Sequence, residues 1–474
     1  MVNPPRGWND ITGIQAPELI RQFAGFSSMD TFSLEDNVMV KNKNIGTKEA
    51  PAARVREGFK RLPAISSPIM GIGSWKEDQL NVIAGGRWRS WRGSYWAEVG
   101  SSLNTSAKWS FTNFKGNFPD VALIAANGVD GVKVYDGTSI RDLENAPAGM
   151  NFVTSHENRL YGAVDNSLHY SALRKPTDWN TVDESGQIVI ENNNGEKISC
   201  VIGGTGKIVI FLPHSMHELY GTGPLNFKLQ LITEEIGCVS HQSAVMVSGI
   251  LFFLSHDGIY RYTGGATPQK DFSLPIQNIV ETINHKAWHT VTAGSDGERY
   301  YISLPINGAS EPNITLEYDP MYNLWNIWDF GHVPTAFGRV QEQMYVGVKE
   351  GFVLEMGGND DAGALTPYMI ETKPFSYGSL AAHARLYRLW VVADIPQNAT
   401  MHVYISNKKD GDTDWTLVKT IASTTDMVAT PIHIPVNKSF YANWVRIKIE
   451  GHGQVTLHEI SRQSRVFRFG LGGG

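Results

Sequence analysis

Short apolar runs recur over residues 80–356, each followed by a turn and a second run that contains aromatic residues. In residues 250–262, for example, ILFFL leads through Ser-His-Asp-Gly into IYRY. The form returns at intervals of 43, 37, 48, 43, 50 and 43 residues, with equivalent points at Leu80, Leu123, Leu160, Ile208, Leu251, Tyr301 and Met344. A repeat of this length made of short strands predicts an all-β fold with a β-propeller, because each small sheet buries its faces only against its neighbours.

The number of repeats sets the number of propeller blades. Seven repeats are visible, and six or eight blades are the alternatives because the repeats diverge in sequence. We expect a strand from the N-terminal region to close the last blade, and the candidates are residues 37–46 and 55–63.

Two segments have the pattern of short helices. Residues 273–284, SLPIQNIVETIN, predict a helix inserted between blades, with Ser273 as its cap and Pro275 in its first turn. Residues 17–25, PELIRQFAG, predict a docking helix that ends at Gly25.

The 43-residue spacing stops after Met356, where a turn-rich acidic stretch begins. Beyond it, strands alternate apolar and polar residues, as in WVRIKIE at 444–450, and this alternation predicts a β-sandwich. The predicted domains are 1–62, an N-terminal segment with a docking helix and a closing strand; 63–360, the propeller; and 366–474, the sandwich with a C-terminal tail. A chain truncated after Met356 is then expected to keep a folded propeller.

The last residues, 461–474, carry three arginines and two phenylalanines before a glycine tail. The pattern predicts a docking strand outside the folded core. Deletion of Arg462–Gly474 is then expected to weaken assembly without unfolding the protein.

Composition narrows the functional classes. With 42% apolar and 19% charged residues the chain is globular, and a net charge of −6 does not favour a nucleic-acid-binding surface. Two cysteines, Cys200 and Cys238, are too few for a disulfide framework, so buried thiols in a reducing compartment are expected. The N-terminus lacks a signal-peptide pattern, and no stretch approaches the ~18 apolar residues of a membrane span, so neither standard export nor membrane insertion is expected.

Ser255, His256 and Asp257 have the residue types of a hydrolase triad but the wrong arrangement. Consecutive residues of a strand point to opposite faces, so a hydrogen-bonded relay is excluded and a turn is the better interpretation. The same Asp-Gly turn recurs at 130–131, 136–137 and 296–297.

The histidine pairs are weak metal candidates. His285 and His289 are spaced i, i+4, but Lys286 stands where the zincin pattern has glutamate. His214 and His217 lie around a proline turn and are weaker still. We therefore expect no catalytic residues, no metal site and no cofactor.

Two further stretches resemble binding elements. Residues 87–96, RWRSWRGSYW, have aromatic side chains that suit stacking on sugars or bases, although packing on one face and solvated charge on the other is the more common arrangement. Residues 406–415, SNKKDGDTDW, resemble the Asp-box turn of sialidase-type propellers, which is a structural element.

The order of these features resembles the tail hub or nozzle proteins of short-tailed bacteriophages, also called packaged-DNA stabilisation or tail tubular proteins. The resemblance lies in NVMVKNKNIGTKEAPAARVREGFKRLP at 37–63, in the strands and turns of 215–265, in PIQNIVETI at 275–283, and in TLEYDPMYNLWNIWD at 315–329. It covers residues 37–360 and, more loosely, the C-terminal domain.

This resemblance implies a structural protein of the virion tail with no catalytic residues to carry over. Six copies would form a ring that binds the portal or adaptor and other tail proteins, is assembled in the host cytoplasm, and closes or gates the DNA exit channel. Net acidity agrees with weak contacts to DNA sliding through during ejection. The alternatives are a minor tail or fibre-attachment protein of a longer-tailed phage and a carbohydrate-active propeller enzyme.

Overall fold

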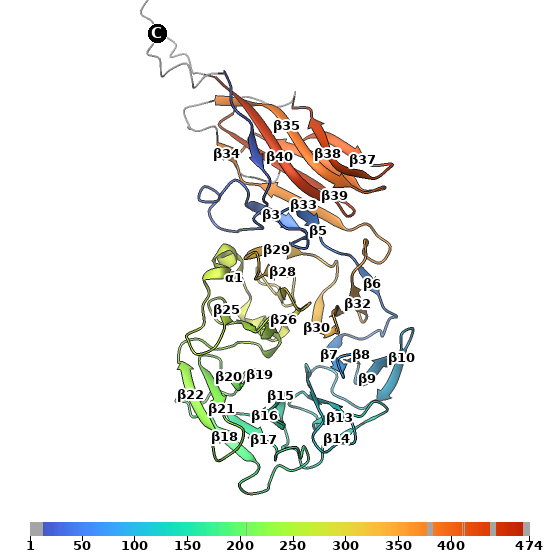
Figure 1. Ribbon diagram of the computed structural model, residues 1–474, viewed down its shortest axis with the longest axis vertical. Coiled ribbons are helices and arrows are strands. Elements are labelled where there is room, and N and C mark those ends of the chain that lie inside the picture. Colours follow the sequence, from blue (N-terminus) through green and yellow to red (C-terminus); the bar gives the residue numbers. More distant parts are fainter. Residues whose placement is uncertain are drawn as a thin grey trace, which may run out of the picture.

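The chain is all-β. The computed structural model describes residues 13–204, 206–376, 383–409, 411, 413–436 and 442–467. Within them, antiparallel strands form seven small sheets and two large ones. Figure 1 shows the small sheets in the lower part of the molecule and the two large sheets above them.

Each of the first four small sheets consists of four consecutive strands joined as hairpins. The strands are β7 (Ile69–Trp75), β8 (Gln79–Ala84), β9 (Arg87–Trp91) and β10 (Trp96–Gly100) in the first sheet; β11 (Ser110–Phe114), β12 (Ala122–Ala126), β13 (Lys133–Tyr135) and β14 (Ile140–Asp142) in the second; β15 (Asn151–His156), β16 (Arg159–Val164), β17 (Ser167–Tyr170) and β18 (Gly186–Val189) in the third; and β19 (Cys200–Gly204), β20 (Lys207–Phe211), β21 (Met216–Tyr220) and β22 (Lys228–Thr233) in the fourth.

The last three small sheets are less uniform. The fifth has three strands, and the seventh takes its fourth strand from the N-terminal region. The strands are β23 (Val245–Val247), β24 (Ile250–Leu254) and β25 (Ile259–Tyr262); β26 (Thr292–Ser295), β27 (Tyr300–Leu304), β28 (Ile314–Asp319) and β29 (Leu324–Trp328); and β30 (Pro334–Val340), β31 (Gln343–Val348), β32 (Val353–Met356) and β6 (Phe59–Arg61).

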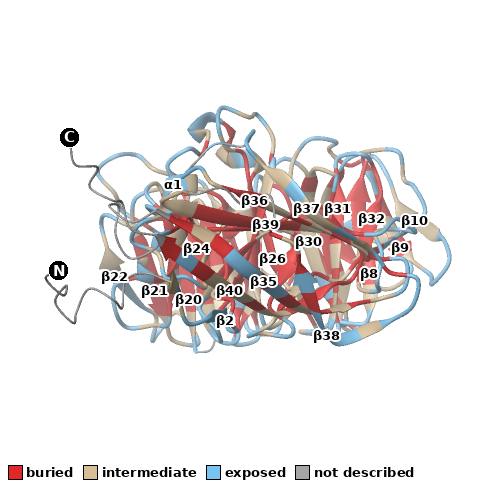
Figure 2. Ribbon diagram, turned by 90° about the horizontal axis from the view of Figure 1, so that it is seen from above, coloured by how far each residue is buried: buried red, intermediate tan, exposed pale blue. Residues whose placement is uncertain are grey.

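The repeat spacing locates these sheets. Every one of the seven equivalent points falls on the second strand of a small sheet, from Leu80 on β8 to Met344 on β31. Apolar residues alternate or run continuously there because both faces of each sheet are covered by its neighbours. Figure 2 shows buried residues along these strands and exposed residues in the loops.

Successive small sheets share apolar cores. The third and fourth, for example, share a core that contains Tyr161 and Ile208, and the fifth and sixth share one that contains Phe252 and Tyr318. Another core joins the seventh sheet to the first and contains Val340.

The first strands of neighbouring sheets also approach closely. Thr112 Oγ1 on β11 donates to Ser155 Oγ on β15 at 3.0 Å, and the backbone N–H of Gly203 on β19 donates to Thr154 Oγ1 at 3.1 Å. On β7, a Cβ added to Gly73 would lie 2.6 Å from the ring of Phe111. Glycine is therefore required where these backbones meet neighbouring side chains.

The insertion between the fifth and sixth sheets is helical, as the sequence predicts, but short. A 3-10 helix at Asp271–Ile276 leads into α1 (Gln277–Val280), and a second 3-10 helix spans His285–Thr290. Another 3-10 turn, His241–Ser243, precedes β23. Ser273 does not cap α1, because its hydroxyl donates to the carbonyl oxygens of Ile259 and Lys270.

The two large sheets combine strands from both ends of the chain and share one apolar core. The seven-stranded sheet contains β1 (Gly13–Ile14), β2 (Glu18–Ile20), β4 (Ile45–Gly46), β5 (Ala53–Val55), β35 (His383–Ile395), β38 (Met427–Ile434) and β40 (Thr456–Phe467). The six-stranded sheet contains β3 (Met39–Lys43), β33 (Pro367–Thr372), β34 (Phe375–Ser376), β36 (Thr400–Ser406), β37 (Thr416–Ala422) and β39 (Trp444–His452).

The docking helix predicted for residues 17–25 is wrong. This segment contains β2, which pairs with β40 between Glu18 and Arg462. A helix this short is marginal without packing, and here the edge of β40 satisfies the backbone while Ile20 and Phe23 enter the core of the large sheets.

The prediction that residues 461–474 lie outside the folded core is also wrong for residues 461–467. They belong to β40, which pairs with β35 up to the His383↔Phe467 position. Arg462 is buried, and its guanidinium binds Glu18 and Asp36 at 2.5 Å each. A deletion starting at Arg462 would therefore remove part of this sheet. Residues 468–474 lie outside the described residues.

Candidate functional site

A cleft with a volume of about 790 Å³ lies where the sixth and seventh small sheets meet the N-terminal segment. Three segments line most of it: Lys48 and Glu57 on either side of β5, Asp296 to Arg299 between β26 and β27, and the hairpin of β30 and β31 from Arg339 to Met344. Lys48, Glu57, Asp296 and Arg299 also line a smaller pocket.

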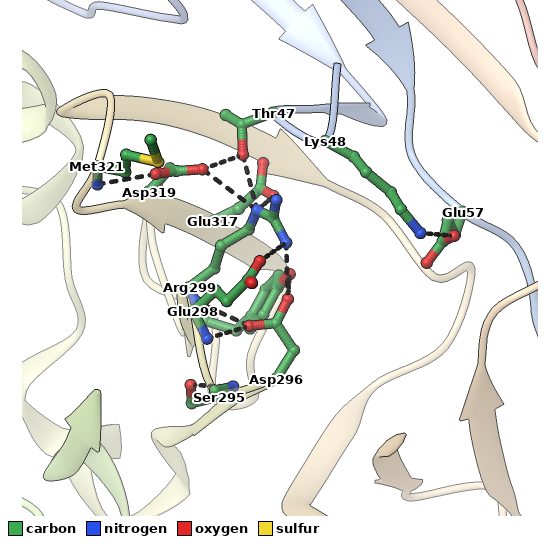
Figure 3. Close-up of polar contacts among 12 residues, drawn as sticks. Thr47, Lys48, Glu57, Ser295, Asp296, Glu298, Arg299, Glu317, Asp319 and Met321 are labelled. Atoms are coloured by element: carbon green, nitrogen blue, oxygen red, sulfur yellow. Dashed lines mark hydrogen bonds and ion pairs between the residues drawn. The ribbon is translucent and has the colours of Figure 1, made fainter. Parts of the chain in front are cut away.

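Arg299 is the centre of the charged cluster in this cleft (Figure 3). Its Nη1 lies 3.0 Å from Asp296 Oδ2 and 3.6 Å from Glu298 Oε2. Its Nε lies 3.3 Å from Asp319 Oδ2 and 3.5 Å from Glu317 Oε1. Four carboxylates thus surround one guanidinium, and the local charge is negative when all of them are ionised.

Local backbone geometry sets up this cluster. In the turn between β26 and β27, Asp296 Oδ1 accepts hydrogen bonds from the backbone N–H groups of Glu298 (2.9 Å) and Arg299 (2.7 Å). Gly297 has φ +108°, a conformation that favours glycine. The pairing of Tyr301 with Glu317 on β28 then brings the Arg299 side chain beside the carboxylates.

Glu317 is the least accessible of the four acids, with a 1% exposed side chain. Burial raises the pKa of Glu317 to about 8, against the opposing effects of a hydrogen bond from Asn326 and the charge of Arg299. Its Oε2 accepts hydrogen bonds from Asn326 Nδ2 at 3.0 Å and from Trp328 Nε1 at 3.2 Å. At neutral pH this carboxyl group therefore holds a proton.

Thr47 links the cluster to the N-terminal strands. Its hydroxyl donates to Asp319 Oδ2 at 2.5 Å and accepts from Arg299 Nε at 2.7 Å. Nearby, Trp328 Nε1 donates to the carbonyl oxygen of Ile45 at 2.9 Å. The arrangement therefore acts as a polar clasp between the sixth small sheet and the β4–β5 segment.

A second clasp lies close by in the same segment. Arg56, whose side chain is fully buried, makes a bidentate pair with Asp361 at 2.9 Å for both oxygens. Its Nε donates to Asn44 Oδ1 at 2.9 Å. Bidentate guanidinium pairs of this kind fix orientation as well as distance.

Ser255, His256 and Asp257 do not form a relay. The N–H of Ser255 donates to the carbonyl oxygen of Gly258 at 2.9 Å, which closes a turn, and Asp257 accepts from Tyr260 and Lys270. These contacts agree with the turn interpretation.

The structure pairs the histidines differently from the sequence spacing. His214 stacks on His256 with ring centroids 4.2 Å apart, and His256 meets Trp288 edge-on at 4.6 Å. His285 stacks on Trp288 at 4.6 Å. Among the described residues, no group of three or more His, Cys, Asp or Glu is arranged to hold a metal ion. Sequence spacing missed the His214–His256 contact because the two residues belong to turns of different sheets.

The two cysteines are buried free thiols. His241 Nδ1 lies 3.2 Å from Cys200 Sγ, and the Cys238 thiol donates to the carbonyl oxygen of Ser240 at 3.2 Å. Burial raises the pKa of Cys200 and lowers the pKa of His241 to about 4, so both groups are neutral at neutral pH.

The aromatic stretch at 87–96 is mainly packed. Trp88 is fully buried, and the rings of Trp91 and Trp96 lie 4.9 Å apart beside the first sheet, while Tyr95 is exposed. The 406–415 stretch connects β36 and β37, and the described part of it is held by Arg446, which donates to the carbonyl oxygens of Lys408 and Gly411. Neither stretch opens onto the cleft.

No protein-family model and no curated protein matches this sequence. A computationally designed protein, Ika8, is 11% identical with a TM-score of 0.41, covering 64% of this chain and 100% of that chain. The extracellular domain of a B. thetaiotaomicron protein named as a hybrid two-component system is 11% identical with a TM-score of 0.45, and the match spans 73% of this chain and 45% of that one. A related extracellular domain, named as a one-component system, is 9% identical with a TM-score of 0.43 over 89% and 64% of the two chains. These scores are too low to bear on fold or function.

Helices in the described part of the chain are all too short or too polar to cross a lipid bilayer.

Proposed function

We propose that the seven small sheets are the blades of one β-propeller and that the two large sheets form a β-sandwich beside it. Support comes from the apolar cores, since each pair of successive small sheets shares one, and from the core that joins the seventh sheet to the first. In this proposal β6 is the strand that closes the last blade.

We also propose that the chain is a structural protein of the virion, the tail hub or nozzle of a short-tailed bacteriophage. The observation that carries the proposal is the course of residues 37–63, one of the segments in which the sequence resembles that family. It contributes β3 and β4–β5 to the two large sheets and then β6 to the last small sheet. The clasps of Arg299 and Arg56 hold this segment on both sides, which suits a ring subunit of fixed shape.

In the proposed propeller, polar contacts between non-neighbouring sheets cross the centre. Lys108 Nζ, ahead of β11, donates to the carbonyl oxygens of Thr290 (3.1 Å) and Val291 (3.2 Å), ahead of β26. Gln242 Nε2 donates to the carbonyl oxygen of Trp109. DNA would therefore pass through a channel enclosed by several copies, with the portal or adaptor on one side, and not through one propeller.

Imaging of particles that contain this chain tests the proposal. We expect six copies around the tail axis at its distal end, and particles that lack the chain should lose packaged DNA to added nuclease. Isolated copies on a fibre, away from the axis, would favour the fibre-attachment alternative and overturn the hub role. Turnover of a polysaccharide by the purified chain would overturn it in favour of a carbohydrate-active enzyme.

A further inference from the structure

Strand β22 presents a free edge. It is the outer strand of the fourth small sheet and pairs, among the described residues, only with β21. Its residues 228–231 are exposed. Leu229 and Leu231 share one face, and Leu225 in the preceding turn is 95% exposed. An exposed edge with apolar side chains is a template for pairing with another strand.

The other outer strands are less suited to the addition of a strand. β10, β14 and β18 have five, three and four residues, against six in β22. In the large sheets, Pro431 lies within β38, and Lys419 lies within β37. Short length, proline and a lysine in the middle of a strand all oppose the addition of a strand at an edge, and the lysine of β22, Lys228, stands at its first position.

The sequence beyond β40 has the pattern of a strand that fits this edge. Phe469 and Leu471 alternate with Arg468 and Gly470, so the apolar side chains of an extended segment would share one face. The pattern is the one expected of an added strand that buries apolar side chains on one face.

Charge and apolar character match in one register. β22 is followed by two exposed acids, Glu234 and Glu235. Antiparallel pairing that places Leu471 beside Leu231 also brings Arg468 opposite Glu234, which lies in the bend directly after the strand. An apolar pair directly across a ladder stabilises it, and an acid just past the end of the strand attracts the arginine.

The two segments of a single copy are too far apart to meet. The Thr456 end of β40 pairs with β5, near the small sheets, and the strand then runs for 12 residues away from it. At about 3.3 Å per residue its Phe467 end lies more than 30 Å farther on. Four residues span at most ~14 Å. Figure 1 places β22 at the rim of the lower part of the molecule, far from the upper sheets.

We propose that Arg468–Leu471 of one copy adds as an antiparallel strand to β22 of a second copy. Donor and acceptor are different surfaces, so the contact is head-to-tail, and a closed set of such contacts forms a ring. This inference adds a contact between subunits to the proposed hub role. It rests on that role only for the closure of these contacts into a ring.

A labelled peptide, RVFRFGLGGG, tests the contact directly. The acceptor is a chain that ends at Phe467, which keeps all of β40. We expect the peptide to bind this chain, and Leu231→Glu to weaken binding at least tenfold because it places a charge on the apolar face. Val428→Glu is the matched control, since Val428 is also exposed on an outer strand, and it should leave binding unchanged.

Mixing experiments test the head-to-tail geometry. The chain that ends at Phe467 has only an acceptor, and full-length Leu231→Glu has only a donor, so each should be monomeric in sedimentation velocity. Their mixture should give heterodimers and nothing larger, whereas the unaltered chain should form larger species.

Three results would overturn the proposal: no peptide binding at millimolar concentration, equal binding by Leu231→Glu, or self-association of the chain that ends at Phe467. Each result leaves the hub role intact, because that role is tested by the position of the chain in particles. Binding of the peptide to another tail protein, and not to this chain, would reassign the donor strand to that partner.

Discussion

Gly338 and Ile72 are in direct contact between the last small sheet and the first: a Cβ added to Gly338 would lie 2.2 Å from Cγ2 of Ile72. The two residues are far apart in sequence, on β30 and β7. No L side chain fits at position 338 without displacement of β7, so the glycine sets the distance between the sheets.

Gly338→Ala is therefore expected to destabilise the protein by about 1–3 kcal/mol, the usual cost of overpacking a close contact. Gly204→Ala is the matched control, since a Cβ there would meet Met246 at an ordinary 3.5 Å. Urea unfolding followed by tryptophan fluorescence measures both. Equal stability of the two variants would mean that the last and first sheets are not held together at this point.

The raised pKa of Glu317 predicts a pH dependence. The folded protein holds the proton up to about pH 8, while the unfolded chain releases it near 4.5. The folded state binds more protons in this window, so this group's stabilising contribution is full below pH 4.5 and is lost as pH rises through 8.

Glu317→Gln should remove that contribution, and the difference in unfolding free energy between the variant and the unaltered protein should change steadily between pH 5 and 8. Glu298→Gln, in the same cluster but with an 81% exposed side chain, should show no such trend. A flat difference for Glu317→Gln would show that the carboxyl group is ionised in the folded protein.

Much of the small-sheet architecture could be predicted from sequence because it is local. Each sheet is built mainly from consecutive strands, so Leu80 or Leu251 identifies its sheet through nearby turns. The large sheets could not be predicted in the same way. Ile20 is buried against strands more than 350 residues later, and a nine-residue segment with apolar positions three apart has the same pattern as a helix.

The clasp formed by Arg299 and Thr47 could not be predicted from the sequence, for a similar reason. The sequence predicts Asp296 correctly as a turn residue. Its second carboxylate oxygen, however, binds Arg299. Thr47 binds the same guanidinium from a turn some 250 residues away. Sequence spacing carries no signal for a contact between distant loops. The only local hint was the density of charged residues in 296–299.

Arg299→Met should destabilise the protein by about 3–5 kcal/mol, because it leaves the carboxylate of buried Asp319 without its cation. Arg87→Met is the control: the Arg87–Glu98 pair is largely exposed, and its loss should cost less than about 1 kcal/mol. Thermal unfolding of both variants gives the comparison. A small effect at Arg299 would mean that the acids in the cluster take up protons when the cation is lost.

Truncation after Met356 tests whether the small sheets are independent of the rest of the chain. The cut removes β33–β40 but keeps β1–β5, whose partners are then gone. Ile20, Phe23, Met39 and Val55 lose their common core, and their exposed apolar surface favours association. We therefore expect the 1–356 chain to aggregate, contrary to the expectation from repeat spacing alone.

A 56–361 fragment removes these strands as well and keeps the Arg56–Asp361 pair, so it should be more soluble and unfold cooperatively. Light scattering and thermal unfolding of the two proteins distinguish the outcomes, and a monomeric, cooperatively folded 1–356 chain would show that β1–β5 do not depend on the C-terminal strands.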